Sequence, residues 1–183
     1  MFIASQKKKE NIAEYLLYMW QMEDLIRAND LDIDKIQENI IDKFTGLTPV
    51  QKKDLTEWYE SLIDMMKREG TEKNGHLQIN KNTLADIADL HGRLMEDSKF
   101  PQYNAAFYRT LPYIVEIRSK AGENKAGEIE SLFNALYGIL LLRISGKEIS
   151  RETTDAAAQI SSFLAMLAKY YKEDRESPLF DKD

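Results

Sequence analysis

The segment from Asn11 to Arg27 constrains the fold most, because its apolar residues do not stay on one face of a helix. At about 100° per residue, one apolar stripe faces one way and a second apolar group projects from the other side, among charged and amide side chains. The stripe comprises Tyr15, Tyr18, Met19, Met22, Leu25 and Ile26, and the second group Leu16, Leu17 and Trp20. We expect such a helix to be buried on both sides, so that some of its polar groups need partners in the fold, a ligand or another subunit.

The rest of the chain predicts an all-α fold, a single multi-helix bundle of about six to seven helices. Its 183 residues suit one domain, and only eight Gly and four Pro favour helices over many short strands. We therefore take residues 1–183 as a single helical domain with a loose tail from about residue 176. The expected helices cover about 6–28, 33–46, 49–70, 84–95, 101–121, 127–145 and a last helix capped by Ser150.

Several of these segments carry specific expectations. The second helix should place Ile33, Ile36, Ile40 and Phe44 on one stripe. Thr48 should cap the third helix, with Pro49 in its first turn and Gly70 at its end. Residues 71–80 should form a polar loop that could include an extended piece at 77–79. Pro112 should kink the fifth helix, which Gly122 ends, and the sixth, apolar almost all round, should lie at the centre beside the first.

Charge and composition exclude some classes of partner. A formal net charge of -6 and a pI near 5.1 argue against a nucleic-acid binder, which would usually show a basic face. The longest apolar run, Ala135 to Leu142, is far below the ~20 residues needed to cross a bilayer, so we expect no membrane partner. The absence of cysteine and an N-terminus unlike a signal peptide favour a cytoplasmic location.

Two loop motifs resemble known ligand loops only in part. Gly122 and Gly127 have the spacing of a phosphate loop, but Glu128 and Ile129 stand where Lys and Ser or Thr should follow. Asp30, Asp32 and Asp34 resemble the start of a calcium loop, but the glycine and glutamate that such a loop needs are absent. A helix–helix turn and a helix-capping cluster are the simpler interpretations.

Structural roles also explain the other polar residues that resemble metal or catalytic sites. Neither His76 nor His91 has a glutamate three residues before it, as a di-iron bundle requires. The pairs Glu57/Glu60 and Asp86/Asp89 loosely resemble a magnesium site, but a solvated acidic face explains them better. His91 fits a hydrogen-bonded core histidine better than a catalytic base. We therefore expect no metal and no cofactor.

The candidate functional residues lie mainly on the first helix. They are Glu14, Tyr18, Gln21 and Asp24, together with Arg143 at the end of the sixth helix. Glu14, Tyr18 and Gln21 are spaced i, i+4 and i+7 and could converge on one bound group, although the same spacing serves a structural polar network. Glu14 and Asp24 above all should have partners within the fold, and Arg143 is one candidate, in an ion pair or as an anion binder.

The opening Phe2-Ile3-Ala4-x-Gln6-Lys7-Lys8-Lys9-Glu10-Asn11-Ile12-Ala13-Glu14-Tyr15-Leu16-Leu17-Tyr18-Met19-Trp20-Gln21-x-Glu23-Asp24 resembles the start of an uncharacterised bacterial family. That family consists of small all-helical proteins, recorded as a domain of unknown function and seen mostly in anaerobic gut bacteria. Leu136-Tyr137-Gly138 and Arg143 are further points of likeness. The resemblance extends over the whole chain and implies a bacterial cytoplasmic helical protein, with no known activity, cofactor or catalytic residue.

Two functional hypotheses remain. The first is a cytoplasmic interaction or scaffolding module that self-associates as a homo-oligomer, most simply a dimer, with an unknown protein or small-molecule partner. An excess of large apolar residues motivates it: Leu16, Leu17, Trp20, Ile139, Leu142, Tyr170 and Tyr171. The second is a small-molecule or nucleotide-handling enzyme whose polar pocket lies on the first helix.

Overall fold

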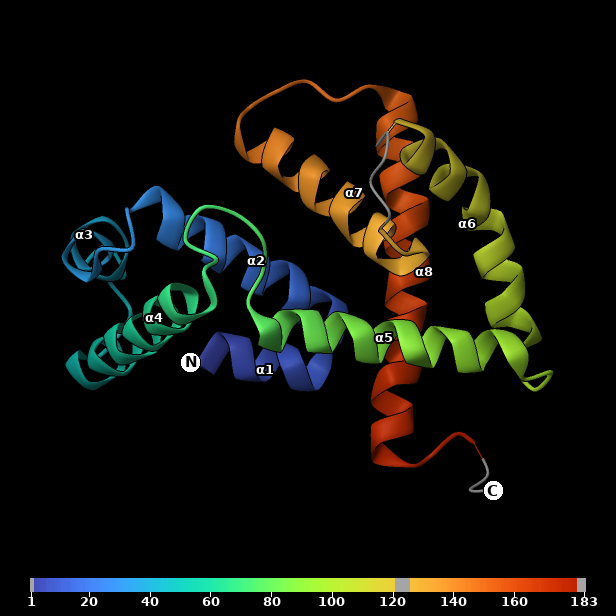
Figure 1. Cartoon of the computed structure of the whole chain (residues 1–183), viewed down its shortest axis with the longest axis horizontal. Coiled ribbons are helices and arrows are strands. Elements are labelled where there is room, and N and C mark those ends of the chain that lie inside the picture. Colours follow the sequence, from blue (N-terminus) through green and yellow to red (C-terminus); the bar gives the residue numbers. More distant parts are fainter. Residues whose placement is uncertain (1, 121–125, 181–183) are drawn as a thin grey trace. The chain divides into compact units, whose positions relative to one another are not determined.

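The computed structural model describes residues 2–120 and 126–180, and all regular structure in this part of the chain is helical (Figure 1). The all-α prediction is confirmed. The elements are α1 (Phe2–Glu10), α2 (Ile12–Ala28), α3 (Ile33–Ile36), a π-helical turn η1 (Gln37–Ile41), α4 (Pro49–Glu69), α5 (Gln78–Glu96), α6 (Pro101–Lys120), α7 (Glu128–Ile144) and α8 (Arg151–Glu176). Across the described residues, no helix is both long and apolar enough to cross a membrane.

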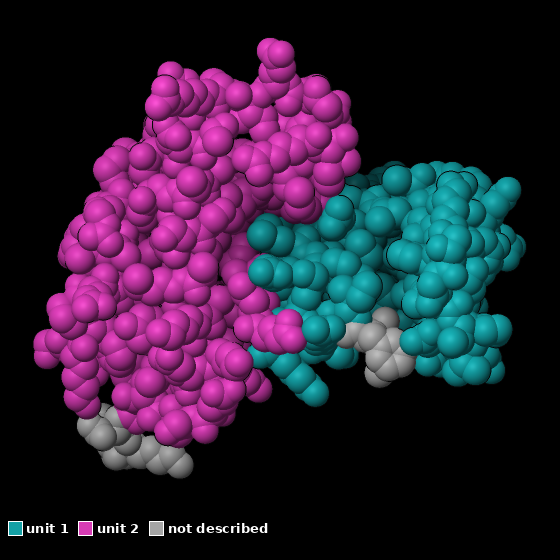
Figure 2. Space-filling model, turned by 180° about the vertical axis from the view of Figure 1, so that it is seen from behind, with its two compact units in different colours: residues 1–9, 14–83 teal, residues 10–13, 84–183 magenta. Residues whose placement is uncertain are grey.

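Contacts between backbone positions divide the chain into two compact units (Figure 2). Unit 1 comprises residues 1–9 and 14–83, and unit 2 comprises residues 10–13 and 84–183. Each unit is described by itself below. The assignment of the chain to a single domain stays a prediction.

The first predicted helix is interrupted at Asn11, so the expectation of one helix over 6–28 was wrong. Helix α1 ends at Glu10 and α2 begins at Ile12. The Asn11 side-chain oxygen accepts a hydrogen bond from the backbone N–H of Ala13 at 3.0 Å, as a residue preceding a helix commonly does. Within α2, Leu16 and Trp20 are buried as fully as Met19, so this helix is covered on both sides.

The segment after α2 contains a π-helical turn that the periodicity did not predict. Ile36 and Ile41 are both fully buried although they are five residues apart, and the backbone N–H of Asp42 donates to the carbonyl of Gln37 in the i→i+5 pattern of a π turn. The expected stripe is therefore wrong at its end: Phe44 is exposed and Ile40 only half-buried. The wider turn rotates the later residues away from the α-helical face.

The predicted ends of α4 and the start of α8 are confirmed. The Thr48 hydroxyl accepts from the backbone N–H of Gln51, and the Gln51 side chain accepts from the backbone N–H of Thr48. Gly70 ends α4 with a left-handed φ of 67°, a conformation that glycine adopts without strain. Ser150 caps α8 through a bond from the backbone N–H of Thr153.

Unit 2 is built on α6, α7, α8 and most of α5. Helix α6 continues through Pro112 and curves along its length (Figure 1). The predicted end of this helix at Gly122 falls outside the described residues. Helix α7 packs against α6 and α8, but its buried residues lie between Ile129 and Tyr137. Its last turn exposes Leu141, Leu142 and Ile144, so the expectation that this helix lies at the centre fails at its C-terminal end.

The segment that follows α8 lies against other residues of unit 2. The backbone N–H of Leu179 donates to Asp174 at 2.9 Å. The centres of the Phe180 and Phe100 rings are 5.6 Å apart, and the Arg93 guanidinium lies 4.6 Å from the centre of the Phe180 ring. Residues 177–180 are thus held by specific contacts.

Candidate functional site

A fully buried glutamate, Glu23, lies in unit 1 and was not among the predicted site residues. Its Oε2 lies 2.5 Å from Nδ1 of His76, and its Oε1 accepts from the backbone N–H of Leu77 at 2.9 Å. The same Oε1 accepts from the side-chain amide of Asn80 at 2.6 Å. We call these four residues the Glu23 centre. Three bonds compensate the carboxylate for the water it loses on burial.

The Glu23 centre explains why α5 begins earlier than predicted. The polar residues of this segment predict a loop as far as Asn80, but α5 begins at Gln78. Glu23 from α2 binds the N–H of Leu77, and Glu69 from α4 binds the N–H of Gln78 at 2.6 Å. Two carboxylates from other helices thus satisfy the free N–H groups at the start of α5 and favour its dipole.

The His76 ring is held on two sides. It stacks on the indole of Trp20 at 4.2 Å between ring centres and 13° between planes, and its Nδ1 faces the Glu23 carboxylate. Its side chain is 31% exposed. A carboxylate that orients an imidazole is also a device of general-base catalysis. The other bonds of Glu23 go to groups at the start of α5, so positioning this helix is the role that all the contacts share.

Arg27 ties the connection between α4 and α5 to α2. Its guanidinium donates to the carbonyl of Thr71 at 3.0 and 3.2 Å and to the carbonyl of Gly75 at 2.5 Å. The same guanidinium pairs with Asp24 at 2.7 Å. Arg27 and Glu23, one helical turn apart on α2, therefore bind this connection at four residues: Thr71, Gly75, His76 and Leu77.

The residues predicted as a polar cluster have mostly local partners. Glu14 pairs with Lys7 at 2.9 Å and its side chain is 59% exposed, and Asp24 pairs with Arg27. Tyr18 is half-buried and stacks on Trp58 with ring centres 6.4 Å apart, and burial raises the pKa of its hydroxyl. Gln21 is half-buried, whereas Arg143 is exposed on α7 in unit 2. A functional role for this cluster stays a prediction.

His91 lies in the core of unit 2, as a hydrogen-bonded core histidine should. It is 8% exposed, its Nδ1 lies 2.6 Å from the hydroxyl of Tyr103, and its Nε2 is 3.9 Å from the Glu128 carboxylate. The rings of Phe107 and Phe163 lie 4.8 and 6.1 Å away. Burial in this aromatic cage lowers the pKa of His91 to about 4. The neutral imidazole is the stable form at pH 7.

The acidic motifs have structural explanations. Asp32 caps α3 by accepting from the backbone N–H groups of Asp34 and Lys35. Glu57 pairs with Lys53 and Asp89 with Arg93, both on exposed helix surface. Among the residues that the structure describes, no group of three or more histidines and carboxylates is placed to hold a metal ion. The glycine pair of the phosphate-loop pattern falls largely on residues outside the described part.

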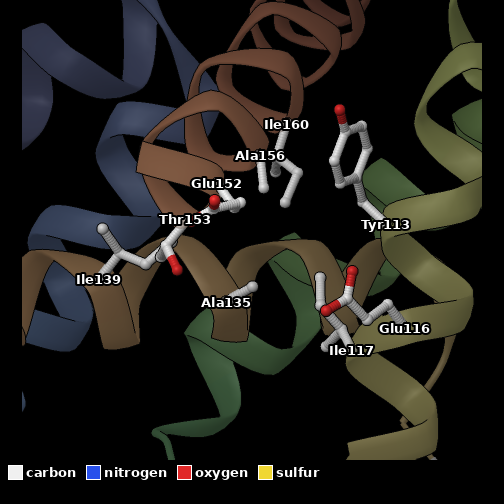
Figure 3. A pocket seen from close by; sticks show the side chains of 9 residues that line it. All are labelled: Tyr113, Glu116, Ile117, Ala135, Ile139, Glu152, Thr153, Ala156 and Ile160. Carbon is white, nitrogen blue, oxygen red and sulfur yellow. The ribbon is translucent and has the colours of Figure 1, made fainter. Parts of the chain in front are cut away.

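A pocket of about 230 Å³ opens between α6, α7 and α8 within unit 2 (Figure 3). Its apolar lining comprises Ile117, Ala135, Ile139, Ala156 and Ile160, and its polar lining comprises Tyr113, Glu116, Glu152 and Thr153. The space exists where α7 and α8 each present an alanine. This pocket is not predictable from sequence patterns, because its residues come from three helices and none belongs to a known motif.

Comparison with known proteins places the chain in a family. Neither a curated protein nor a solved structure matches it. The family model described as "Domain of unknown function (DUF4924)" matches residues 1–177, which is nearly the whole length. The predicted likeness to a family of unknown function is thereby confirmed. The chain belongs to the DUF4924 family.

Proposed function

We propose that this protein is an interaction module that self-associates through the outer face of α6. The observation that carries the proposal is an apolar stripe along that face, made of Pro101, Ala105, Tyr108, Pro112 and Val115, all of which are exposed. These positions follow the 4-3-4-3 spacing of a helix–helix seam. Tyr108 is 62% and Val115 60% exposed.

The stripe is unusual for a chain in which 31% of residues are charged. Between Pro101 and Val115, the exposed residues of α6 include a single charged side chain, Arg109. A large apolar face on a helix otherwise rich in buried contacts typically marks an interface. The opposite face of α6 is already used, since Tyr103, Phe107 and Ile114 are buried in unit 2.

A second copy of the chain is the occupant that the charges favour. Arg109 and Glu116 flank the same edge of the stripe, seven residues apart. An antiparallel pair of α6 helices centred near Pro112 would set Tyr108 of one copy against Val115 of the other. It would also bring Arg109 within reach of Glu116 of the other copy, at both ends of a two-fold interface.

The residues from which the sequence predicts self-association lie outside α6, and of these Leu142 is exposed at the end of α7 whereas three others are core. Leu16 and Trp20 are buried within the chain, and Tyr171 is 8% exposed. Their large apolar groups therefore act as core. The enzyme hypothesis on α2 has weaker support, because Glu14 and Asp24 are engaged in ion pairs with neighbouring residues.

Multi-angle light scattering at micromolar to millimolar concentration tests the proposal. The wild type should show a mass that rises with concentration toward twice 21.2 kDa. Val115→Glu should shift the dimerisation constant by at least about tenfold, because it introduces a charge into the seam.

Val50→Glu is the matched control, since Val50 is 70% exposed at the start of α4 in unit 1. It should dimerise like the wild type. A wild-type protein that stays monomeric over the whole range contradicts the proposal. So does a dimer that Val115→Glu and Val50→Glu weaken equally.

A further inference from the structure

The pocket between α6, α7 and α8 is lined in a way that selects one kind of ligand. Five of its nine lining residues are aliphatic, three isoleucines and two alanines, and they come from all three helices. The remaining four supply two carboxylates, a phenol ring and a hydroxyl, and no lysine, arginine or histidine is among the nine. An apolar body with one positive group would satisfy both parts of this lining.

The carboxylates come from two different helices. Glu116 belongs to α6 and Glu152 to the first turn of α8, and Figure 3 shows both among the side chains around the pocket. The pKa of Glu152 is lowered by its own backbone N–H and by the Ser150 hydroxyl. This carboxylate therefore keeps its negative charge over the range in which most amines are protonated.

Tyr113 adds an aromatic ring to the same pocket. The face of a tyrosine ring attracts an ammonium group within about 6 Å of its centre. A carboxylate combined with an aromatic ring is a chemical arrangement that distinguishes an ammonium from a neutral group of the same size.

From this lining we propose that the pocket binds a small organic ammonium, such as a primary arylalkylamine, with its apolar body between the isoleucines and alanines of the three helices. A volume of about 230 Å³ lies just below the usual range for drug-sized ligands, so the ligand has on the order of ten non-hydrogen atoms. The ammonium lies toward Glu116, Glu152 and Tyr113. The proposal concerns a pocket within unit 2 and goes beyond self-association through α6, with which it shares one residue, Glu116, whereas Glu152 and Tyr113 are outside the α6 stripe.

Calorimetric titration at pH 7 with 2-phenylethylamine and its neutral counterpart 2-phenylethanol tests the charge requirement. The amine should bind at least about tenfold more tightly than the alcohol. The double variant Glu116→Gln with Glu152→Gln should reduce amine affinity to that of the alcohol. Equal affinity of the wild type for the two compounds overturns the proposal, and so does an amine affinity that the double variant leaves unchanged.

Filling the pocket tests the location. Ala156→Leu places a larger side chain into the space and should abolish amine binding, whereas Ala158→Leu, exposed two residues further along α8, should leave it unchanged. In the wild type, methyl resonances of Ala135 and Ala156 should shift on titration with the amine, a measurement that needs no variant to fold. Absence of these shifts at amine concentrations on the order of 10 mM rejects the site.

Discussion

The His91 cage makes stability depend on pH with a sign and a size that follow from the structure. The ordinary pKa of a histidine is about 6.5, and burial among Tyr103, Phe107 and Phe163 lowers the pKa of His91 to about 4. Desolvation lowers the pKa of His91 even though the Glu128 carboxylate lies 3.9 Å from Nε2, because that carboxylate is partly exposed. The folded protein thus resists protonation of this ring.

The direction of the effect follows from proton binding. Between pH 6.5 and pH 4 the unfolded chain binds a proton at His91 that the folded chain does not bind, so stability rises with pH in this window. The contribution is complete above pH 6.5 and is lost as the pH falls. Integration over the two pKa values gives a loss of about 2 kcal/mol by pH 5 and about 3 kcal/mol by pH 4.

Urea unfolding of the wild type and of His91→Gln between pH 4 and pH 7 measures this contribution. The variant should be less stable at pH 7, because it loses the bond to Tyr103 and the ring packing. Between pH 7 and pH 5, however, its free energy of unfolding should fall by about 2 kcal/mol less than that of the wild type. A proton NMR titration provides a second measurement, in which the His91 ring signals should not move between pH 7 and pH 5. Parallel stability curves for the two proteins, or a His91 ring that titrates near pH 6.5, would refute the reasoning.

Three further substitutions test the local contacts by urea unfolding. Glu23→Ala should lower the free energy of unfolding by about 3 kcal/mol, because it leaves the buried groups at the start of α5 without their acceptor. Glu14→Ala is the control and should cost less than about 1 kcal/mol, because the ion pair of Glu14 with Lys7 is exposed. Similar losses for the two would show that the Glu23 centre is not structural. Thr48→Ala should cost about 1 kcal/mol through loss of the α4 cap, and an unchanged midpoint would contradict that role. Gly70→Ala should cost about 1 kcal/mol from its left-handed φ alone, since a Cβ there meets no atom within 4 Å, whereas Gly46→Ala, equally open but without a positive φ, should be neutral.

Sequence reasoning predicted the parts of this fold that local chemistry determines. Thr48 and Gly70 set the ends of α4, and Ser150 sets the start of α8, each through bonds to residues within five positions. Periodicity likewise predicted the ends of α6 and α7 to within a residue or two, as far as the structure describes these helices. Capping residues and apolar spacing are properties of a short window, so one sequence is enough to detect them.

The missed features depend on residues far apart in the chain. The start of α5 is set by Glu23, 54 positions before Leu77, and no window of sequence contains both residues. The same distance hid the Glu23 centre, since Glu23 is an ordinary acidic residue until the fold surrounds it. The pocket of unit 2 escaped detection for a related reason: an alanine shows where a side chain is small, but only packing shows whether the space stays open.

The π turn at Gln37–Ile41 bears on how sequences in this family can change length. A π turn closes each of its hydrogen bonds over one residue more than an α-helical turn does. Removing the exposed Glu38 would leave Ile36 and the present Ile41 four positions apart, which places both on the same face of an ordinary α-helix. A relative one residue shorter at this point can therefore keep the same two isoleucines in its core, and a gap there in a comparison of sequences marks a change of helix type rather than a lost contact.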